Sequence, residues 1–269
     1  MNTSGSFVYR GIKRDIEKYP KIMRVWSKEY DLSGSESLIL NEFKKYGCSL
    51  IEGNINPIEL VGYAQHFGLP TRLIDWSNNP FVALFFAVNG TDYTNEESYK
   101  LLYLEKCNLL VLDEMFYSKG IFNVVDFYDS GISNYMSFLN AISTKEGLKT
   151  HYSGYIEARY QQDTWESRSL LDFQQKVDNN RLIMMDISYS NPRIIAQQGL
   201  FIIPKLLEFK KIDDEYTQSN LKVIEIDKSL KGSILLRLKN MNISKKALFF
   251  DLTNICEEIT RDIISTKTE

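Results

Sequence analysis

The feature that most constrains the possible folds of this chain is a polar segment that lies between two predicted apolar helices. An apolar helix is predicted from Pro57 to Phe67, because proline is tolerated in a first helical turn, and Gly68 ends it. A second apolar helix is predicted from Pro80 onward, and Gly90 ends it. The connection over residues 71–77 carries a cation, an anion, a tryptophan and two hydroxyl groups. Because small turn residues would suffice for a plain connector, this composition favours a ligand pocket.

A structural interpretation of the same connection is left open. Arg72 and Asp75 would then form a local ion pair, and Trp76 would anchor the core. For Asp75 we favour this structural role, in which its carboxylate orients Arg72. His66, just before the connection, is either a base or ribose ligand, or a histidine that orders the chain by hydrogen bonding.

Two further polar interruptions are candidates for the same pocket. Gln197 and Gln198 precede Gly199 and a strand that is apolar throughout, so that Gln197 would point into a cleft. Near the N-terminus, Arg10 leaves a short strand before Gly11 and is suited to grip a phosphate or a carboxylate. Amides at a strand edge and a solvated surface arginine are the alternatives.

The low glycine and proline content predicts long regular elements and few turns. The chain has 14 Gly and 6 Pro in 269 residues, about 7% against a usual ~12%. Helical periodicity is clear around residues 39–50 and in a final helix over residues 251–263. Short apolar or alternating runs predict separated strands near residues 7–10, 101–104, 109–112, 181–188, 200–203 and 224–227. This mixture predicts an α+β fold in one domain spanning residues 1–269.

Composition and charge exclude several classes of protein. With 43% hydrophobic and 25% charged residues, the chain resembles a globular protein and not a disordered or collagen-like one. The net charge of −3 gives no reason to expect nucleic-acid binding by the whole molecule. No apolar run approaches the ~20 residues of a membrane-spanning helix, and no secretory signal is seen. We therefore expect a cytoplasmic protein without a membrane partner.

No metal-ligand spacing and no glycine-rich phosphate loop is present. Cys48, Cys107 and Cys256 lie far apart and form no ligand spacing with the two histidines, so we expect no metal. The basic residues of the C-terminal third alternate with Leu and Ile, and Asp213–Glu215 is interpreted as a solvated charge run. A nucleic-acid-directed effector, such as a nuclease, is therefore the last-ranked function.

Three segments together resemble the FRG domain family, which is named for its aromatic-Arg-Gly start. They are Tyr9-Arg10-Gly11, the long run Gln65–Ala87 (QHFGLPTRLIDWSNNPFVALFFA) and Arg193–Phe201 (RIIAQQGLF). The resemblance extends over residues 7 to about 204, which would form the core that carries the motifs. A strand and helices over residues 205–269 would pack on that core to complete a single FRG domain.

The order of these segments also resembles the ADP-ribosyltransferase fold, in which a split, mixed β-sheet core is surrounded by helices. That resemblance implies catalytic roles for Arg10, which would grip NAD, and for Gln197, which would hold the reacting ribose. It implies that Tyr9 or Trp76 stacks on a flat ring of NAD. The residues that we predict to bind the cofactor are Tyr9, Arg10, Gly11, His66, Thr71, Arg72, Trp76, Ser77 and Gln198.

The sequence departs from the transferase pattern at two positions. Gln197 stands where the catalytic glutamate is usual, and a glutamine brings no negative charge to a developing cation. Arginine-modifying transferases carry an acid two residues earlier, where this chain has Ile195, or Ala196 if Gln198 is the matching residue. Slower chemistry or a non-enzymatic role must therefore be allowed, and arginine is a poor candidate for the acceptor.

The leading hypothesis is an NAD-dependent enzyme similar to ADP-ribosyltransferases, acting as a toxin or an anti-phage defence effector. NAD would be its substrate, a nucleic acid or a protein its ADP-ribose acceptor, and an antitoxin or other inhibitory partner would restrain it. The alternative is a non-catalytic module that binds a nucleotide in the same pocket.

Overall fold

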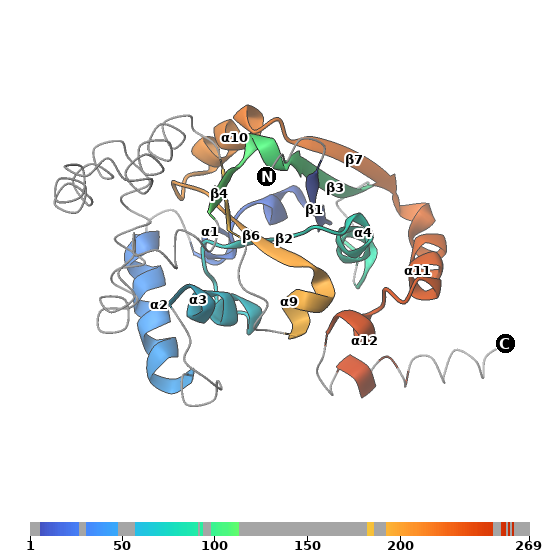
Figure 1. Cartoon of the computed structure of the whole chain (residues 1–269), viewed down its shortest axis with the longest axis horizontal. Coiled ribbons are helices and arrows are strands. Elements are labelled where there is room, and N and C mark those ends of the chain that lie inside the picture. The colour runs from blue at the N-terminus through green and yellow to red at the C-terminus, as the bar shows by residue number, and fades with distance from the viewer. Residues whose placement is uncertain are drawn as a thin grey trace, which may run out of the picture.

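The computed structural model of the protein describes residues 6–26, 31–47, 57–90, 92–93, 98–112, 182–185, 192–249, 254–256, 258 and 260. Figure 1 shows one sheet with helices on both sides. The N-terminal elements are β1 (Phe7–Ile12), the 3-10 helix η1 (Asp15–Lys18), α1 (Lys21–Val25), α2 (Leu32–Gly47), α3 (Pro57–His66), β2 (Ile74–Ser77) and α4 (Pro80–Val88).

The remaining described elements complete the sheet and add helices on both sides of it. They are β3 (Ser98–Glu105), η3 (Lys106–Asn108), β4 (Leu110–Leu112), β5 (Ile183–Met185), α9 (Pro192–Gln197), β6 (Gly199–Ile203), α10 (Phe209–Gln218), β7 (Lys222–Asp227), η4 (Lys228–Leu230), α11 (Lys231–Asn240) and α12 (Lys245–Leu248). Mixed helices and strands of this kind confirm the α+β class predicted from sequence.

All seven described strands belong to one hydrogen-bonded sheet in the order β4-β5-β6-β2-β1-β3-β7. Neighbouring strands run antiparallel except β4 and β5, which are parallel. The sheet is therefore continuous, in contrast to the split sheet expected from the transferase resemblance. Pairing is thinnest between β1 and β2, where only Tyr9 and Ser77 lie opposite each other, while β1 and β3 pair along all of β1.

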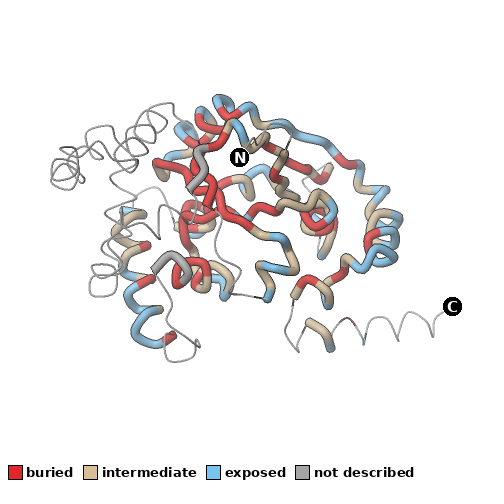
Figure 2. Tube along the Cα trace, in the orientation of Figure 1, coloured by how far each residue is buried: buried red, intermediate tan, exposed pale blue. Residues whose placement is uncertain are grey.

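The two faces of the sheet bury separate apolar clusters. Because side chains alternate along a strand, Leu102 and Leu104 of β3 pack on the side of α1 and α10, and Tyr99 and Leu101 pack on the side of α4. Buried segments accordingly follow the sheet in Figure 2, and exposed ones follow β7 and α11. The fold thus has two helical layers around a central sheet.

The helix α4 lies directly on β1, and this close contact requires a glycine. A Cβ atom added to Gly11 would lie 1.9 Å from the carbonyl oxygen of Ala83 and 2.5 Å from the amide nitrogen of Ala87. Both neighbours are backbone atoms, so they cannot move aside cheaply. Gly11 therefore serves helix-on-strand packing, although the sequence assigned it to cofactor binding.

Local sequence signals correctly placed the ends of the central helices. The side chain of Asn79 accepts a hydrogen bond from the amide of Phe81 at 2.9 Å, and Pro80 occupies the first turn of α4. Gly68 and Gly90, which follow α3 and α4, have φ values of +94° and +91°. Such values suit glycine, and they explain why both helices end where the sequence predicts.

Several expectations from the sequence are wrong in detail. The first strand continues through Gly11 to Ile12, and the connection after Pro70 contains the strand β2. The predicted charge run Asp213–Glu215 lies in α10, where Glu215 is only 5% exposed. Helix α9, which precedes β6, was not expected. The predicted final helix lies mostly outside the described residues.

Candidate functional site

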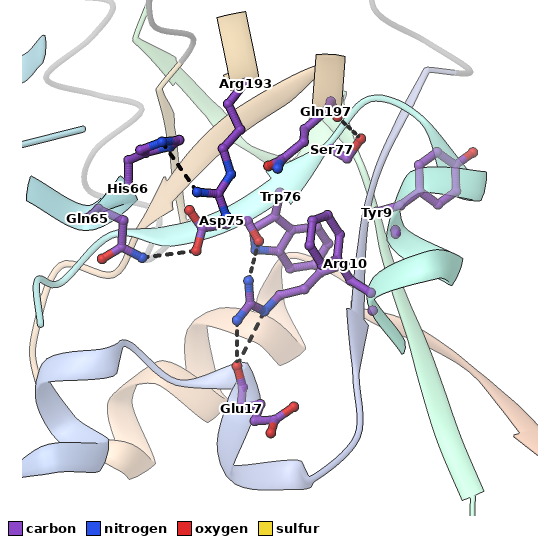
Figure 3. Close-up of a pocket in the computed structure, with 13 residues that line it drawn as sticks. Tyr9, Arg10, Glu17, Gln65, His66, Asp75, Trp76, Ser77, Arg193 and Gln197 are labelled. Atoms are coloured by element: carbon purple, nitrogen blue, oxygen red, sulfur yellow. Dashed lines mark hydrogen bonds between the residues drawn. The ribbon is translucent and has the colours of Figure 1, made fainter. Parts of the chain in front are cut away.

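A cavity of about 310 Å³ opens beside the junction of β1 and β2. Figure 3 shows polar side chains from β1, α3, β2 and α9 turned toward it. The residues that line the cavity are Tyr9, Arg10, Gly11, Glu17, Gln65, His66, Asp75, Trp76, Ser77, Ala83, Phe86, Arg193 and Gln197. All three polar interruptions identified in the sequence thus contribute to one cavity.

Strand and helix periodicity explain which side chains share the cavity. Asp75 and Ser77 lie two positions apart on β2 and so lie on the same face of that strand. Arg193 and Gln197 lie four positions apart on α9 and so share a helix face. Because Ser77 lies opposite Gly199 in the pairing of β2 with β6, no side chain of β6 stands at that position.

Arg10 holds three backbone segments together at the floor of the cavity. Its Nη2 and Nε atoms donate to the carbonyl oxygen of Glu17 at 2.9 and 3.3 Å, and its Nη1 donates to the carbonyl oxygen of Asp75. The guanidinium thereby links β1 to η1 and to β2, where strand pairing is thinnest. Arg10 lines the cavity, but much of its donor capacity serves the fold.

A chain of hydrogen bonds orients the carboxylate of Asp75. The buried hydroxyl of Thr71 donates to Oε1 of Gln65 at 2.8 Å, and Nε2 of Gln65 donates to Oδ2 of Asp75 at 3.0 Å. Thr71 lies outside the cavity and acts on it through Gln65. The structural role predicted for Asp75 is therefore wrong in its partner, because this carboxylate lies beside Gln65 and not beside Arg72.

His66 and Arg193 form a pair on the adjacent wall. Nη1 of Arg193 lies 3.3 Å from Nε2 of His66, and the guanidinium carbon lies 4.1 Å from the ring centroid of Phe249. A guanidinium can only donate, so His66 accepts through Nε2 in this pair. Stacking and hydrogen bonding together hold a positive charge at the cavity wall.

Ser77 and Gln197 join β2 to α9 across the top of the cavity. The hydroxyl of Ser77 donates to the carbonyl oxygen of Gln197 at 2.7 Å and accepts from the amide of Asn79 at 2.9 Å. The side-chain amide of Gln197 donates to the carbonyl oxygen of Leu248 at 3.0 Å. This bond orients the amide of Gln197, which leaves its Oε1 as the acceptor end of the side chain.

Two predicted ligand residues lie away from the cavity. Arg72 is 2% exposed, and its Nε donates to Oε2 of Glu36 at 2.6 Å. The predicted local ion pair of Arg72 with Asp75 is therefore wrong, and Arg72 lies outside the cavity lining. Gln198 has φ of +46° and accepts through its carbonyl oxygen from the amide of Asn78 at 2.9 Å, so it acts as a turn residue outside the cavity lining.

The aromatic residues differ in how much surface they offer to a ligand. Trp76 lines the cavity but is only 3% exposed, so little of its ring is free to stack. Its buried Nε1 has no hydrogen-bond partner among the described residues. Tyr9 is half-buried beside Phe7 and Tyr103, and its ring lies apart from the polar side chains in Figure 3.

Burial near the cavity also affects a second arginine. Arg24, on α1, has a half-buried side chain whose Nε is buried and has no hydrogen-bond partner within the described part of the chain. Burial lowers the pKa of Arg24, and the positive charge of Arg10 lowers it further. The carboxylates of Glu17 and Asp75 oppose this lowering of the pKa of Arg24.

Among the described residues, no group of three or more His, Cys, Asp or Glu side chains is arranged to hold a metal ion. In the same residues, no helix has the length and apolar character needed to cross a membrane.

Sequence reasoning missed several residues of the cavity. Glu17, Gln65 and Arg193 were not identified as candidates, although they line it. A signal was present for Arg193, which lies one helical turn before Gln197 in the same motif. No local pattern could have identified Glu17, because its place depends on how η1 follows β1.

Comparison with protein families gives one match. Residues 5–96, about a third of the chain, match the family profile of the FRG domain. The comparisons with curated proteins and with solved structures found no match. The match includes β1, α3, β2 and α4 and confirms the FRG resemblance for that part of the chain. Helix α9, with Arg193 and Gln197, lies beyond the matched residues.

Proposed function

We propose that this protein binds NAD in the cavity and transfers its ADP-ribose to a nucleic-acid or protein acceptor. One observation carries the proposal: Arg10, Ser77 and Gln197 come from three segments far apart in the sequence and line the same cavity. The resemblance to ADP-ribosyltransferases assigns these three residues to NAD. Their convergence is what a shared NAD site requires.

The chemistry of the cavity suits cleavage of a nicotinamide–ribose bond. That cleavage creates a positively charged ribosyl centre and a neutral leaving group, so it needs little proton transfer. It needs anchored phosphates and groups that hold the ribose in a reactive pose. Arg193 offers donors for phosphate, and Oε1 of Gln197 offers an acceptor for a ribose hydroxyl.

Arg193 and Arg10 are both candidates to bind the pyrophosphate, and their side chains are held in different ways. Three of the five N–H groups of Arg10 donate to backbone carbonyl oxygens, so its contribution to a ligand is mainly its charge. Arg193 is held in place by Phe249 and by Nε2 of His66. A side chain positioned in this way loses less conformational entropy when it binds an anion.

The size of the cavity limits how NAD would be bound. A volume of about 310 Å³ lies at the lower end of the ~300–1,000 Å³ range for small-molecule sites. A dinucleotide would therefore extend beyond the enclosed part. The enclosed part, which carries Asp75, Ser77 and Gln197, would take the nicotinamide ribose, and Arg193 at its wall would take the phosphates.

A second candidate is a module that binds a nucleotide without reaction. The observation in its favour is the side chain of Gln197, which carries no charge and donates to Leu248. A glutamine in this position would bind a ribose but would stabilise a ribosyl cation only weakly. Both candidates use the same residues for binding, so they differ only in turnover.

Calorimetry with NAD, together with an assay of nicotinamide release, separates the two candidates. We expect the wild type to bind NAD and to release nicotinamide, and the Arg193→Ala variant to bind ~10–100-fold more weakly. Gln197→Ala should lower release more than binding. Lys210→Ala, on an exposed part of α10, is the matched control and should behave as the wild type.

Each outcome either favours one of the two candidate functions or rejects the cavity as the NAD site. Binding without release supports the non-catalytic module. If folded Arg10→Ala and Gln197→Ala proteins retain full binding and full release, the cavity is not the NAD site and the proposal is wrong. Melting curves are needed for Arg10→Ala, because the guanidinium of Arg10 also connects three backbone segments.

A further inference from the structure

We propose that Asp75 supplies the negative charge that Gln197 lacks, as the catalytic carboxylate beside the ribosyl centre of NAD. The inference rests on the proposed NAD chemistry and extends it to a residue that sequence reasoning gave a structural role. It addresses the main weakness of the transferase assignment, because a cation that forms in a cavity without a facing anion is poorly stabilised.

Two carboxylates line the cavity, and their oxygen atoms are used differently. Oε2 of Glu17 accepts from the amide of Lys13 at 2.9 Å, and Oε1 pairs with Nε of Arg14 at 3.1 Å, so both oxygens serve the η1 turn. Asp75 accepts from Gln65 through Oδ2. Its Oδ1 has no hydrogen-bond partner among the described residues, and its side chain is exposed to the cavity.

The carboxylate of Asp75 is held in a defined orientation. The completely buried Thr71 accepts from the amide of Leu73 at 3.1 Å and donates to Oε1 of Gln65 at 2.8 Å. Oε1 of Gln65 is thereby fixed toward Thr71, so Nε2 must face Leu73 and Asp75. Such a chain of hydrogen bonds would keep the carboxylate in place before a ligand arrives.

Backbone contacts place Asp75 close to the other predicted ligand residues. Its carbonyl oxygen accepts from Nη1 of Arg10, and its side chain shares a face of β2 with Ser77, which is bonded to Gln197. Figure 3 shows the carboxylate of Asp75 between the His66–Arg193 pair and Arg10. A ribose bound near Ser77 and Gln197 would therefore lie within reach of this carboxylate.

The reaction step balances without an oxidant or reductant. The bond from ribose C1′ to the pyridinium nitrogen breaks, and its electron pair leaves on nicotinamide, which becomes neutral. The positive charge moves to the ribosyl centre, where the carboxylate of Asp75 opposes it. A lone pair of the acceptor, which is water or a target nucleophile, forms the new bond to C1′, and the acceptor's proton passes to solvent.

The test is the Asp75→Asn variant, assayed for NAD binding by calorimetry and for nicotinamide release. Asparagine keeps the shape and can still accept from Gln65, so we expect the dissociation constant to change less than about 3-fold while release falls ~10²-fold. Asp214→Asn, at an exposed position of α10, is the matched control and should release nicotinamide as the wild type does. A Gln65→Leu variant, which frees the carboxylate, should lower release ~10-fold with unchanged binding.

The possible results separate this inference from the proposed function. If the wild type releases nicotinamide and a folded Asp75→Asn protein releases it equally fast, the assignment of Asp75 is wrong and the NAD chemistry stands. If the wild type binds NAD without release, both are wrong. Should Asp75→Asn unfold, Gln65→Leu decides: an unchanged release rate in that variant overturns the role of Asp75.

Discussion

Arg72 and Asp75 lie three positions apart in the sequence, yet their surroundings differ in almost every physical respect. Arg72 forms a buried pair with Glu36, whereas Asp75 lines the open cavity. Arg72 is 2% exposed, and Glu36 is completely buried. The carboxylate of Glu36 accepts hydrogen bonds through both of its oxygens. Oε1 accepts from the backbone amide of Arg72 at 2.7 Å, and Oε2 accepts from Nε of Arg72 at 2.6 Å. Asp75, three residues later, faces the cavity with one oxygen unpartnered among the described residues.

The polar connection over residues 71–77 therefore contains two functionally separate parts, which we call the closed device and the open device. Residues 71–72 make the closed device, which locks α2 against the connection before β2 and satisfies its own polar groups. Residues 75–77 make the open device, which presents polar groups to a ligand. Burial with complete pairing indicates structure, and exposure in a concave site with incomplete pairing indicates function. Variants in the two devices should therefore lower different quantities.

The largest expected effect is on the closed device. Glu36→Ala should lower the free energy of unfolding by about 4 kcal/mol, because it leaves the guanidinium of Arg72 buried without its partner. Urea denaturation measures this loss. Glu42→Ala, which removes only an exposed ion pair with Lys45, is the control and should cost less than about 1 kcal/mol. Equal losses in the two variants would contradict the distinction between buried and exposed pairs.

Gly11→Ala tests whether a residue of the cavity lining acts through packing. We expect a loss of about 3 kcal/mol in unfolding free energy, because the added methyl group would overlap the backbone of α4. The control is Gly232→Ala in α11, where an added Cβ meets nothing within 4 Å and helix propensity favours alanine. A stable Gly11→Ala protein with weakened NAD binding would instead assign Gly11 to the ligand.

Glu215 is a second buried carboxylate, and its hydrogen bonds are longer than those of Glu36. Glu215 is buried, and it accepts from the amide of Lys205 at 3.3 Å or longer. Burial raises the pKa of Glu215 from 4.5 to about 8, against the opposing charge of Lys205. Between these pH values the folded protein holds a proton that the unfolded chain has lost. The unfolding free energy therefore falls as pH rises from about 4.5 to 8 and levels off above it.

The variant Glu215→Gln isolates this contribution of Glu215. We expect it to gain on the order of 2 kcal/mol over the wild type at pH 8.5, and no comparable gain at pH 4, where the wild-type carboxyl is already protonated. Urea denaturation of both proteins at the two pH values measures the difference. A gain of the same size at both pH values would show that titration of Glu215 is not the cause.

The smallest loss of stability is expected at Ser77, a residue of the open device whose hydroxyl also joins β2 to α9. Ser77→Ala removes the donor to Gln197 and the acceptor for the amide of Asn79, which should cost about 1 kcal/mol in unfolding free energy. It should also weaken NAD binding by releasing α9 from β2. Thermal melting and calorimetry on one sample measure both quantities, and a loss in neither would remove Ser77 from the site.

Much of the secondary structure could be predicted because its signals are local. Helical spacing, Pro80 after Asn79, and Gly68 past the end of α3 depend only on neighbouring residues, and the structure confirms them. The set of cavity residues was partly predictable, since each polar interruption stands out against an apolar background. Arg193 and Gln65 were missed because their significance lies in the partners that they meet in the folded chain, His66 and Asp75.

Local patterns predicted most of the helices and strands, although not α9 or β2, and they marked three segments with unusual polar residues, because periodicity and capping act between neighbours. The role of each polar residue depends on contacts made in the folded chain. Arg72 pairs with a glutamate 36 positions earlier, while Asp75 turns into a cavity shared with α9. Those outcomes depend on how the helices pack around the sheet, and packing is settled by the burial of the whole chain at once.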